Sequence, residues 1–130
     1  MHPLTPGRRG RAERTVTPSQ TAVALGSGSL PVLGTPALLA LMEAAAVDAL
    51  AALLPPETTS VGIYVELRHL AATPVGGRVR AEATLTAVEG RTLTFEISAY
   101  DAQEQIGQAL HRRVLVENER FMRRVEGKGA

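Results

Sequence analysis

The feature that most constrains the fold of this chain is an apolar segment of leucine and alanine running from Thr35 to Leu54. Thr35 is a residue type that caps helices, Pro36 suits a first helical turn, and the pair Pro55-Pro56 stops a helix. The segment therefore predicts one helix of about 18 residues, roughly 27 Å long. Because apolar residues occupy nearly its whole circumference, this helix cannot lie on an open surface and must be covered on several sides.

The periodicity changes from helical to alternating at Ser60, which indicates strands. Four rows of alternate apolar residues follow one another, at Val61–Leu67, Val79–Ala87, Leu93–Ala99 and Ile106–Val116. Short turns separate these rows, so neighbouring strands should pair antiparallel. The earlier residues 15–25 contain several β-branched residues, and we expect them to form a first strand or extended arm.

An all-round apolar helix and a half-apolar antiparallel sheet have one simple solution, in which the sheet curls around the helix. That arrangement is the hot-dog fold, an α+β fold in which one long central helix follows the first strand, giving the order β-α-β-β-β-β. Helix surface that the sheet leaves uncovered would then face a second subunit. We therefore expect a homodimer with two-fold symmetry.

Charge is distributed unevenly along the chain. Residues 1–14 carry four arginines against one glutamate, whereas the whole chain has a formal net charge of +1. Their proline, glycine and arginine content predicts a mobile basic tail. We expect a single domain over residues 15–126 and a second short tail over residues 127–130. The first residues lack the apolar core of a secretory signal.

Composition excludes several function classes. The sequence contains no cysteine, which argues against disulfides, thiolate metal sites and a cysteine nucleophile, and indicates a reduced, cytoplasmic protein. Aromatic residues make up 3% of the chain, too few for a nucleic-acid stacking platform. No apolar run reaches the length of a membrane helix, and three scattered histidines predict no metal site. Nucleic-acid, membrane, metal and cofactor binding are therefore not expected.

Glu43 is the most informative candidate for chemistry, because it is the only ionisable residue between Ala37 and Val47. A carboxylate in apolar surroundings is normally paired, protonated or open to a functional cavity, although solvation at a helix edge is an equal alternative. Asp48 lies about 140° further around the helix and is interpreted as solvated or inter-subunit. His69 shares the alternation of Val61–Leu67 and should point to their side. Both His69 and His111 could be purely structural histidines.

Several short strings occur in an order that is similar to one family. They are Leu41-Met42-Glu43-x-Ala45, Ser60-Val61-Gly62, His69-x-Ala71-Ala72-Thr73-Pro74-x-Gly76, Val88-Glu89-Gly90-Arg91-x-Leu93, and Ile106-Gly107 followed by His111-x-Arg113. The chain resembles the hot-dog thioesterases related to the fluoroacetyl-CoA-specific thioesterase, from about Thr15 to Phe121. This resemblance implies a dimeric hot-dog fold, an acyl-CoA substrate, and hydrolysis of its thioester to free acid and CoA.

The resemblance also implies a site. The family's catalytic threonine, glutamate and histidine match Thr35, Glu43 and His69, with Glu43 as base or nucleophile, while Gly62 and Arg113 match residues that line the substrate site. Arg112, Arg113 and Arg120 are also candidates for the phosphates of CoA. The aromatic lid of the family is replaced here by residues 28–34, which contain no phenylalanine. The sequence therefore does not predict which acyl group the substrate carries.

Two alternatives to hydrolysis are open. A non-catalytic module of the same fold would bind acyl-CoA or another acyl ligand in a tunnel between sheet and helix. A hydratase or dehydratase would also use a carboxylate and a histidine. The deciding geometry is whether Glu43 and His69 meet at one cavity.

Overall fold

The computed structural model describes residues 4–129 and has one sheet, one long helix and several short helices. Its elements are β1 (Arg9–Thr15), the 3-10 helix η1 (Pro18–Gln20), α1 (Ala22–Leu25), α2 (Thr35–Leu50), β2 (Thr58–His69), β3 (Arg78–Glu89), β4 (Thr92–Tyr100), β5 (Gln105–Glu117) and α3 (Asn118–Glu126). The predicted order of one strand, a long helix and four strands is confirmed.

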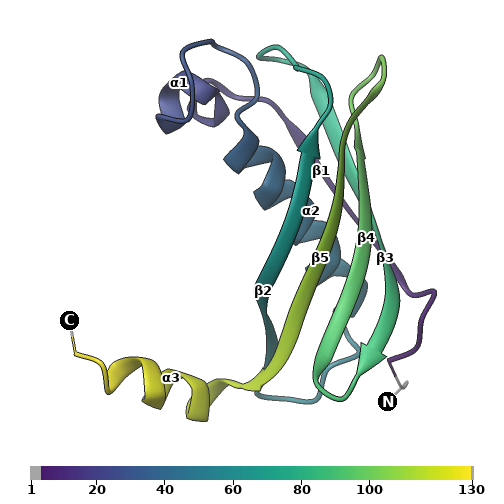
Figure 1. Cartoon of the computed structure of the whole chain (residues 1–130), viewed down its shortest axis with the longest axis vertical. Coiled ribbons are helices and arrows are strands. Elements are labelled where there is room, and N and C mark those ends of the chain that lie inside the picture. The colour runs from purple at the N-terminus through teal and green to yellow at the C-terminus, as the bar shows by residue number, and fades with distance from the viewer. Residues whose placement is uncertain (1–3, 130) are drawn as a thin grey trace.

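The five strands form one antiparallel sheet in the order β1-β3-β4-β5-β2. The sheet curls along its length, and α2 lies against its concave side (Figure 1). Three inward rows, on β3, β4 and β5, bury the residues that pack on this helix: Val79, Ala81, Ala83, Leu85, Leu93, Phe95, Ile97, Ala99, Ile106 and Ala109. The expected α+β hot-dog fold is therefore correct.

Helix α2 differs from its prediction at both ends. Gly34 is the N-cap, so Thr35 is the first helical residue and its hydroxyl is free for another partner. The helix ends at Leu50, earlier than predicted, because Ala52 takes a left-handed conformation with φ of 65° and turns the chain toward β2. One face is fully buried, but Pro36, Ala40 and Val47 are exposed and Glu43 is half-buried. This stripe is the side that the sheet does not cover.

The predicted mobile tail is wrong for residues 9–14, which belong to β1. Arg9 and Arg11 alternate with Gly10 and Ala12, so the arginines point to solvent while the small residues face α2. Outward arginines do not prevent a strand, since their charges stay hydrated and Glu13 pairs with both Arg11 and Arg78. The ordered unit therefore starts before residue 15, and the predicted first strand over residues 15–25 is replaced by η1 and α1. Residues 1–3 and 130 of the predicted tails lie outside the described residues.

Close packing of α2 against β1 closes that edge of the sheet. A Cβ at Gly10 would lie 2.2 Å from both the Ala45 carbonyl oxygen and the Ala49 nitrogen, so only glycine fits. The Arg11 backbone N–H donates to Asp48 Oδ2 at 2.8 Å, so Asp48, which is solvent-exposed as predicted, also has a partner on β1. A helix and its side chain thus protect the β1 edge from pairing with another chain.

Strand β2 forms the opposite edge and contains a bulge. Gly62 pairs with Arg113 and Tyr64 pairs with Arg112, so Ile63 is an extra residue in the ladder. The extra residue reverses the alternation: Ser60 and Gly62 face inward before it, and Val65, Leu67 and His69 face inward after it. The prediction that Val61 shares the side of His69 is therefore wrong. Gly62 and His69, which an unbroken strand would place on opposite faces, point to the same side.

The chain ends in α3, which was not predicted. This helix leaves the sheet at the end of β5, next to the start of β2, and projects away from the body (Figure 1). No residue of α3 is buried. Among residues 4–129, no helix is long and apolar enough to span a membrane.

The contact between β1 and α2 makes Gly10 a stability test. We expect Gly10→Ala to lower the free energy of unfolding by about 2 kcal/mol or more, because the new methyl meets backbone atoms that cannot rotate away. Gly127→Ala is the matched control, since its Cβ would keep an ordinary distance of 3.4 Å from the Arg123 carbonyl oxygen. Chemical denaturation measures both, and equal stabilities for the two variants would contradict this packing.

Candidate active site

Glu43 projects from the uncovered stripe of α2 toward β2 and β5. Its Oε2 accepts a hydrogen bond from Arg113 Nη1 at 3.1 Å, and 40% of its side chain is exposed. Glu43 lines an open hollow of about 290 Å³ with Gly62 and His111. One carboxylate oxygen is therefore tied to a guanidinium while the other is available to a molecule in the hollow.

Arg113 is itself held rigidly inside the protein. It is 6% exposed, its Nε donates to Ser60 Oγ at 2.8 Å, and its Nη2 donates to the Ser60 carbonyl at 3.0 Å. A guanidinium offers five N–H donors in a fixed plane, so these bonds to Ser60 orient the group that reaches Glu43. The same bonds make Arg113 unavailable to the phosphates of CoA, which corrects that part of the expectation.

His111 completes this cluster from the inward row of β5. Its Nδ1 donates to the Tyr64 carbonyl at 2.8 Å, which leaves Nε2 to accept from Arg113 Nη1 at 3.1 Å. Burial lowers the pKa of His111, and the Arg113 cation acts in the same direction, against the opposing effects of the Tyr64 carbonyl and Glu43. The imidazole is thus held neutral, and its lone pair helps fix the guanidinium.

Gly62 makes space for the carboxylate. A Cβ at this position would lie 2.7 Å from Glu43 Oε2 and 3.2 Å from His111 Cε1. Its φ is unremarkable, so glycine is needed here for room and not for backbone freedom. Gly62 therefore lines the hollow beside Glu43.

Thr35 and His69 form a second group at the N-terminus of α2. Thr35 Oγ1 and His69 Nδ1 are 2.8 Å apart, and both line a shallow hollow of about 420 Å³. Burial lowers the pKa of His69, opposed by the Ala71 carbonyl, and within residues 4–129 its buried Nε2 has no hydrogen-bond partner. Most backbone groups at this helix start are already used, because Pro36 has no N–H and the Gly34 and Ala37 N–H groups donate to the Gln20 and Gly34 carbonyls. Within the described part of the chain, the Thr35 N–H is the one left for an anionic oxygen.

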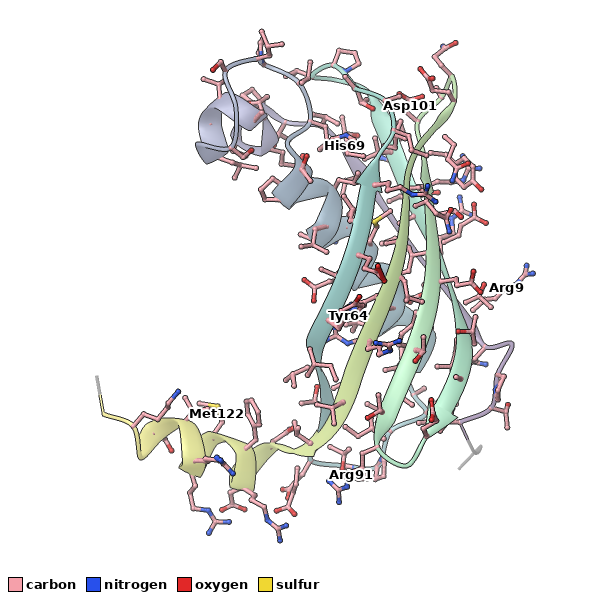
Figure 2. All side chains as sticks on the ribbon, in the orientation of Figure 1. Arg9, Tyr64, His69, Arg91, Asp101 and Met122 are labelled. Atoms are coloured by element: carbon pink, nitrogen blue, oxygen red, sulfur yellow. The ribbon has the colours of Figure 1, made fainter. Side chains whose placement is uncertain are left out.

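The two groups do not meet within one chain. Thr35 and Glu43 are separated by eight residues of helix, or about 12 Å along its axis, and the hollows they line share no residue. Both hollows nevertheless open beside β2, and Figure 2 shows His69 at one end of this strand and Tyr64 near its middle. A single chain therefore carries the two groups in separate hollows along β2.

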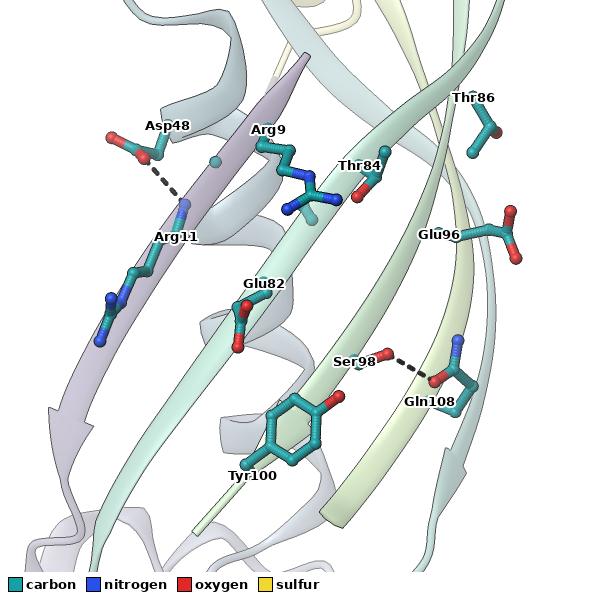
Figure 3. A pocket seen from close by; sticks show the side chains of 12 residues that line it. Arg9, Arg11, Asp48, Glu82, Thr84, Thr86, Glu96, Ser98, Tyr100 and Gln108 are labelled. Carbon is teal, nitrogen blue, oxygen red and sulfur yellow. Dashed lines mark hydrogen bonds between the residues drawn. The ribbon is translucent and has the colours of Figure 1, made fainter. Parts of the chain in front are cut away.

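Other hollows lack these groups. One of about 560 Å³ lies on the outer face of the sheet, lined by residues that include Arg9, Glu82 and Tyr100 (Figure 3). The charged side chains of this hollow carry both signs and are hydrated at the surface. The Arg80 guanidinium carbon lies 4.6 Å from the centroid of the Tyr100 ring and covers it. No three potential metal ligands gather anywhere in residues 4–129.

The sequence predicted Thr35, Glu43, His69, Gly62 and Arg113 as site residues but gave no role to two residues that hold Arg113. Ser60 and His111 occur in the strings shared with the family, yet only the structure shows that they bond to Arg113. A signal was available: His111 and Arg113 share the inward alternation of Ala109 on β5. Two polar side chains in an inward row require partners, and the uncovered carboxylate on the helix is the natural one.

Comparison with known proteins places this geometry in a family. The model of the fluoroacetyl-CoA-specific thioesterase family matches residues 16–119. The fluoroacetyl-CoA thioesterase of Streptantibioticus cattleyicolor is 39% identical over 97 residues, which are 75% of this chain and 70% of that protein. A solved structure of a fluoroacetyl-CoA thioesterase superposes with a TM-score of 0.93 at 32% identity, covering 99% of this chain and 100% of the other. A thioesterase-superfamily member from Thermus thermophilus gives 0.88 at 28% identity, covering 98% and 97%.

The neutral, buried His111 predicts loss of stability in acid. An unfolded histidine titrates near its ordinary pKa of 6.5, above that of the folded state, so the unfolded chain binds more protons as the pH falls. The stabilisation is complete above about pH 7 and is lost progressively below it. Thermal unfolding between about pH 7 and pH 5 should show a falling midpoint, with a shallower fall in His111→Gln, which keeps an acceptor for Arg113. Identical slopes would contradict a neutral His111.

Proposed function

The chain belongs to the fluoroacetyl-CoA-specific thioesterase family and is a thioesterase, and from this we propose that it hydrolyses an acyl-CoA to free acid and CoA with Thr35, Glu43 and His69. The observation that carries the proposal is the carboxylate of Glu43, which is fixed through Oε2 by Arg113 and lines an open hollow. Family membership favours this enzyme over the non-catalytic binding module and over a hydratase. The absence of cysteine supports a cytoplasmic location.

We propose further that the active form is a homodimer joined through β2. The β1 edge is closed by α2, whereas β2 has an open edge beside which the apolar side chains of Ile63, Tyr64 and Val65 are 54%, 42% and 36% exposed. An open, apolar edge strand is a template for pairing with a second chain. The uncovered stripe of α2, where Val47 is 49% exposed, is a further apolar surface that a partner subunit would cover.

Antiparallel pairing of two β2 strands would complete the site. A two-fold axis between Val65 and Glu66 would set Gly62 of one β2 opposite His69 of the other. Glu43 lies beside Gly62 in the first half, and His69 ends the second half. Glu43 of the partner subunit would then approach Thr35 and His69 of this one, so that each dimer holds two shared sites.

The chemistry follows from these groups. The free Oε1 of Glu43 either removes a proton from water, which attacks the thioester carbonyl carbon, or attacks that carbon itself before water does. The carbonyl oxygen becomes an oxyanion, which the Thr35 N–H at the start of α2 can stabilise. Collapse breaks the C–S bond and releases the CoA thiolate, which takes up a proton. Thr35 orients His69 through Nδ1, and Nε2 is placed to carry that proton.

Release of free thiol from a panel of acyl-CoAs tests the reaction and its residues. We expect Glu43→Gln and His69→Asn each to lower kcat by about 10²-fold to 10⁴-fold, the usual contribution of a general acid or base. Asp48→Asn is the control, because it changes a carboxylate on the same helix and keeps an oxygen for the Arg11 N–H. Full activity in Glu43→Gln would remove Glu43 from the mechanism.

Mixing two inactive variants tests whether the site is shared. In a mixed dimer of Glu43→Gln and His69→Asn, one of the two sites would combine intact His69 with intact Glu43 of the partner subunit. After subunit exchange, random pairing should restore about a quarter of the wild-type activity. If each chain holds a complete site of its own, every site in the mixture lacks one group, and no activity returns.

A further inference from the structure

Helix α3 exposes an apolar face that nothing in its own chain covers. Phe121, Met122 and Val125 are 37%, 48% and 43% exposed, and they lie on one side of the helix. Figure 2 shows Met122 on this helix, far from the body of the sheet. Its arginines Arg120, Arg123 and Arg124 occupy other positions around the axis. A nine-residue helix of this kind is too short to be stable alone and needs tertiary contact.

A second exposed apolar surface lies at the opposite end of β2. We call residues 21–34 the α1 segment; they contain α1 and the loop that leads into α2, and none of them is charged. Val23, Leu25 and Leu30 are exposed by 53%, 44% and 65%. The segment is fixed at its base, since Leu33 N–H donates to the Thr73 carbonyl at 2.9 Å and Gly34 N–H donates to the Gln20 carbonyl at 2.9 Å. It adjoins Thr35 and the hollow of His69.

Symmetry relates these two surfaces. Figure 1 shows the α1 segment and α3 at opposite ends of β2, both projecting beyond its free edge to the left of the view. A two-fold axis perpendicular to the sheet, as β2 pairing requires, exchanges the ends of β2. It therefore brings α3 of one subunit toward the α1 segment of the other.

We propose that α3 docks through Phe121, Met122 and Val125 onto the α1 segment of a second copy of this chain and covers the surface beside its Thr35 and His69. The inference rests on the proposed β2-paired assembly. The α1 segment has no charge that contact with the apolar face of α3 would bury. Docking removes the exposed apolar side chains of both surfaces from water. The active site of one subunit is thereby bounded by the C-terminal helix of its partner.

A membrane is the other surface that an amphipathic helix could meet, and charge argues against it. The four basic residues of 117–128 are offset by three acidic ones, Glu117, Glu119 and Glu126, whereas attraction to anionic lipid requires a cluster of about four to eight unopposed cations. The helix is also shorter than most interfacial helices. The second copy is the better occupant.

Disulfide trapping tests the contact, because the chain has no cysteine of its own. Met122→Cys is made in one preparation, and Val23→Cys, Leu25→Cys or Leu30→Cys in another; mixed proteins are oxidised mildly and run without reductant. Linkage within a chain is impossible, since β2 spans about 40 Å and a disulfide needs Cα atoms within about 7 Å. Arg124→Cys, about 200° around α3 from Met122, is the matched control.

We expect a two-chain band from Met122→Cys with at least one of the three partners, and none from Arg124→Cys. Absence of that band while light scattering shows a dimer would overturn the docking of α3 and leave the proposed hydrolysis intact. A monomer in solution would overturn both the docking and the shared site. Binding to anionic vesicles that is lost in Met122→Ser would assign the helix to a membrane and also overturn the proposal.

Discussion

An apolar helix must be covered on every side, and here the sheet covers only one part of α2. The buried face, with Leu38, Met42 and Ala45, packs on the curled sheet. The other face carries Pro36, Ala40 and Val47 in the open, with Glu43 among them. The same incomplete cover leaves the β2 edge unpaired. The exposed apolar stripe of the helix, the open strand edge and the Glu43 carboxylate thus lie together, and the proposed second subunit would cover all three.

The proposed chemistry depends on the side chains of the sheet that bond to the Glu43 carboxylate. A charge at an apolar surface is stabilised by a fixed partner, and Arg113 is that partner because Ser60 and a neutral His111 hold it in one orientation. The bulge at Ile63 is equally necessary, since it turns Gly62 and His69 to the same side of β2 despite their odd spacing. In a regular strand, Gly62 with its neighbour Glu43 would lie on one face of β2 and His69 on the other.

Much of this architecture could be predicted from sequence, because periodicity reports burial. The long helix and the inward rows of β3 and β4 follow directly from it. The prediction failed where local pattern and tertiary contact disagree. Arginines on β1 suggested a mobile tail, although they point to solvent from a strand whose inner face is packed on α2. Thr35 matched a helix cap, yet the cap is Gly34 and the threonine hydroxyl contacts His69. The bulge has no sequence pattern of its own.

The central claim is that β2 is an internal strand of a two-subunit sheet at whose centre the site is completed. Hydrogen exchange of the Thr58–His69 amides, read by mass spectrometry at catalytic concentrations, tests it most directly. An unpaired edge strand protects only the alternate amides that bond to β5. We expect nearly all of the β2 amides to be protected. On dilution, the amides that do not bond to β5 should lose their protection as activity falls. Protection of only alternate amides in fully active protein would contradict it.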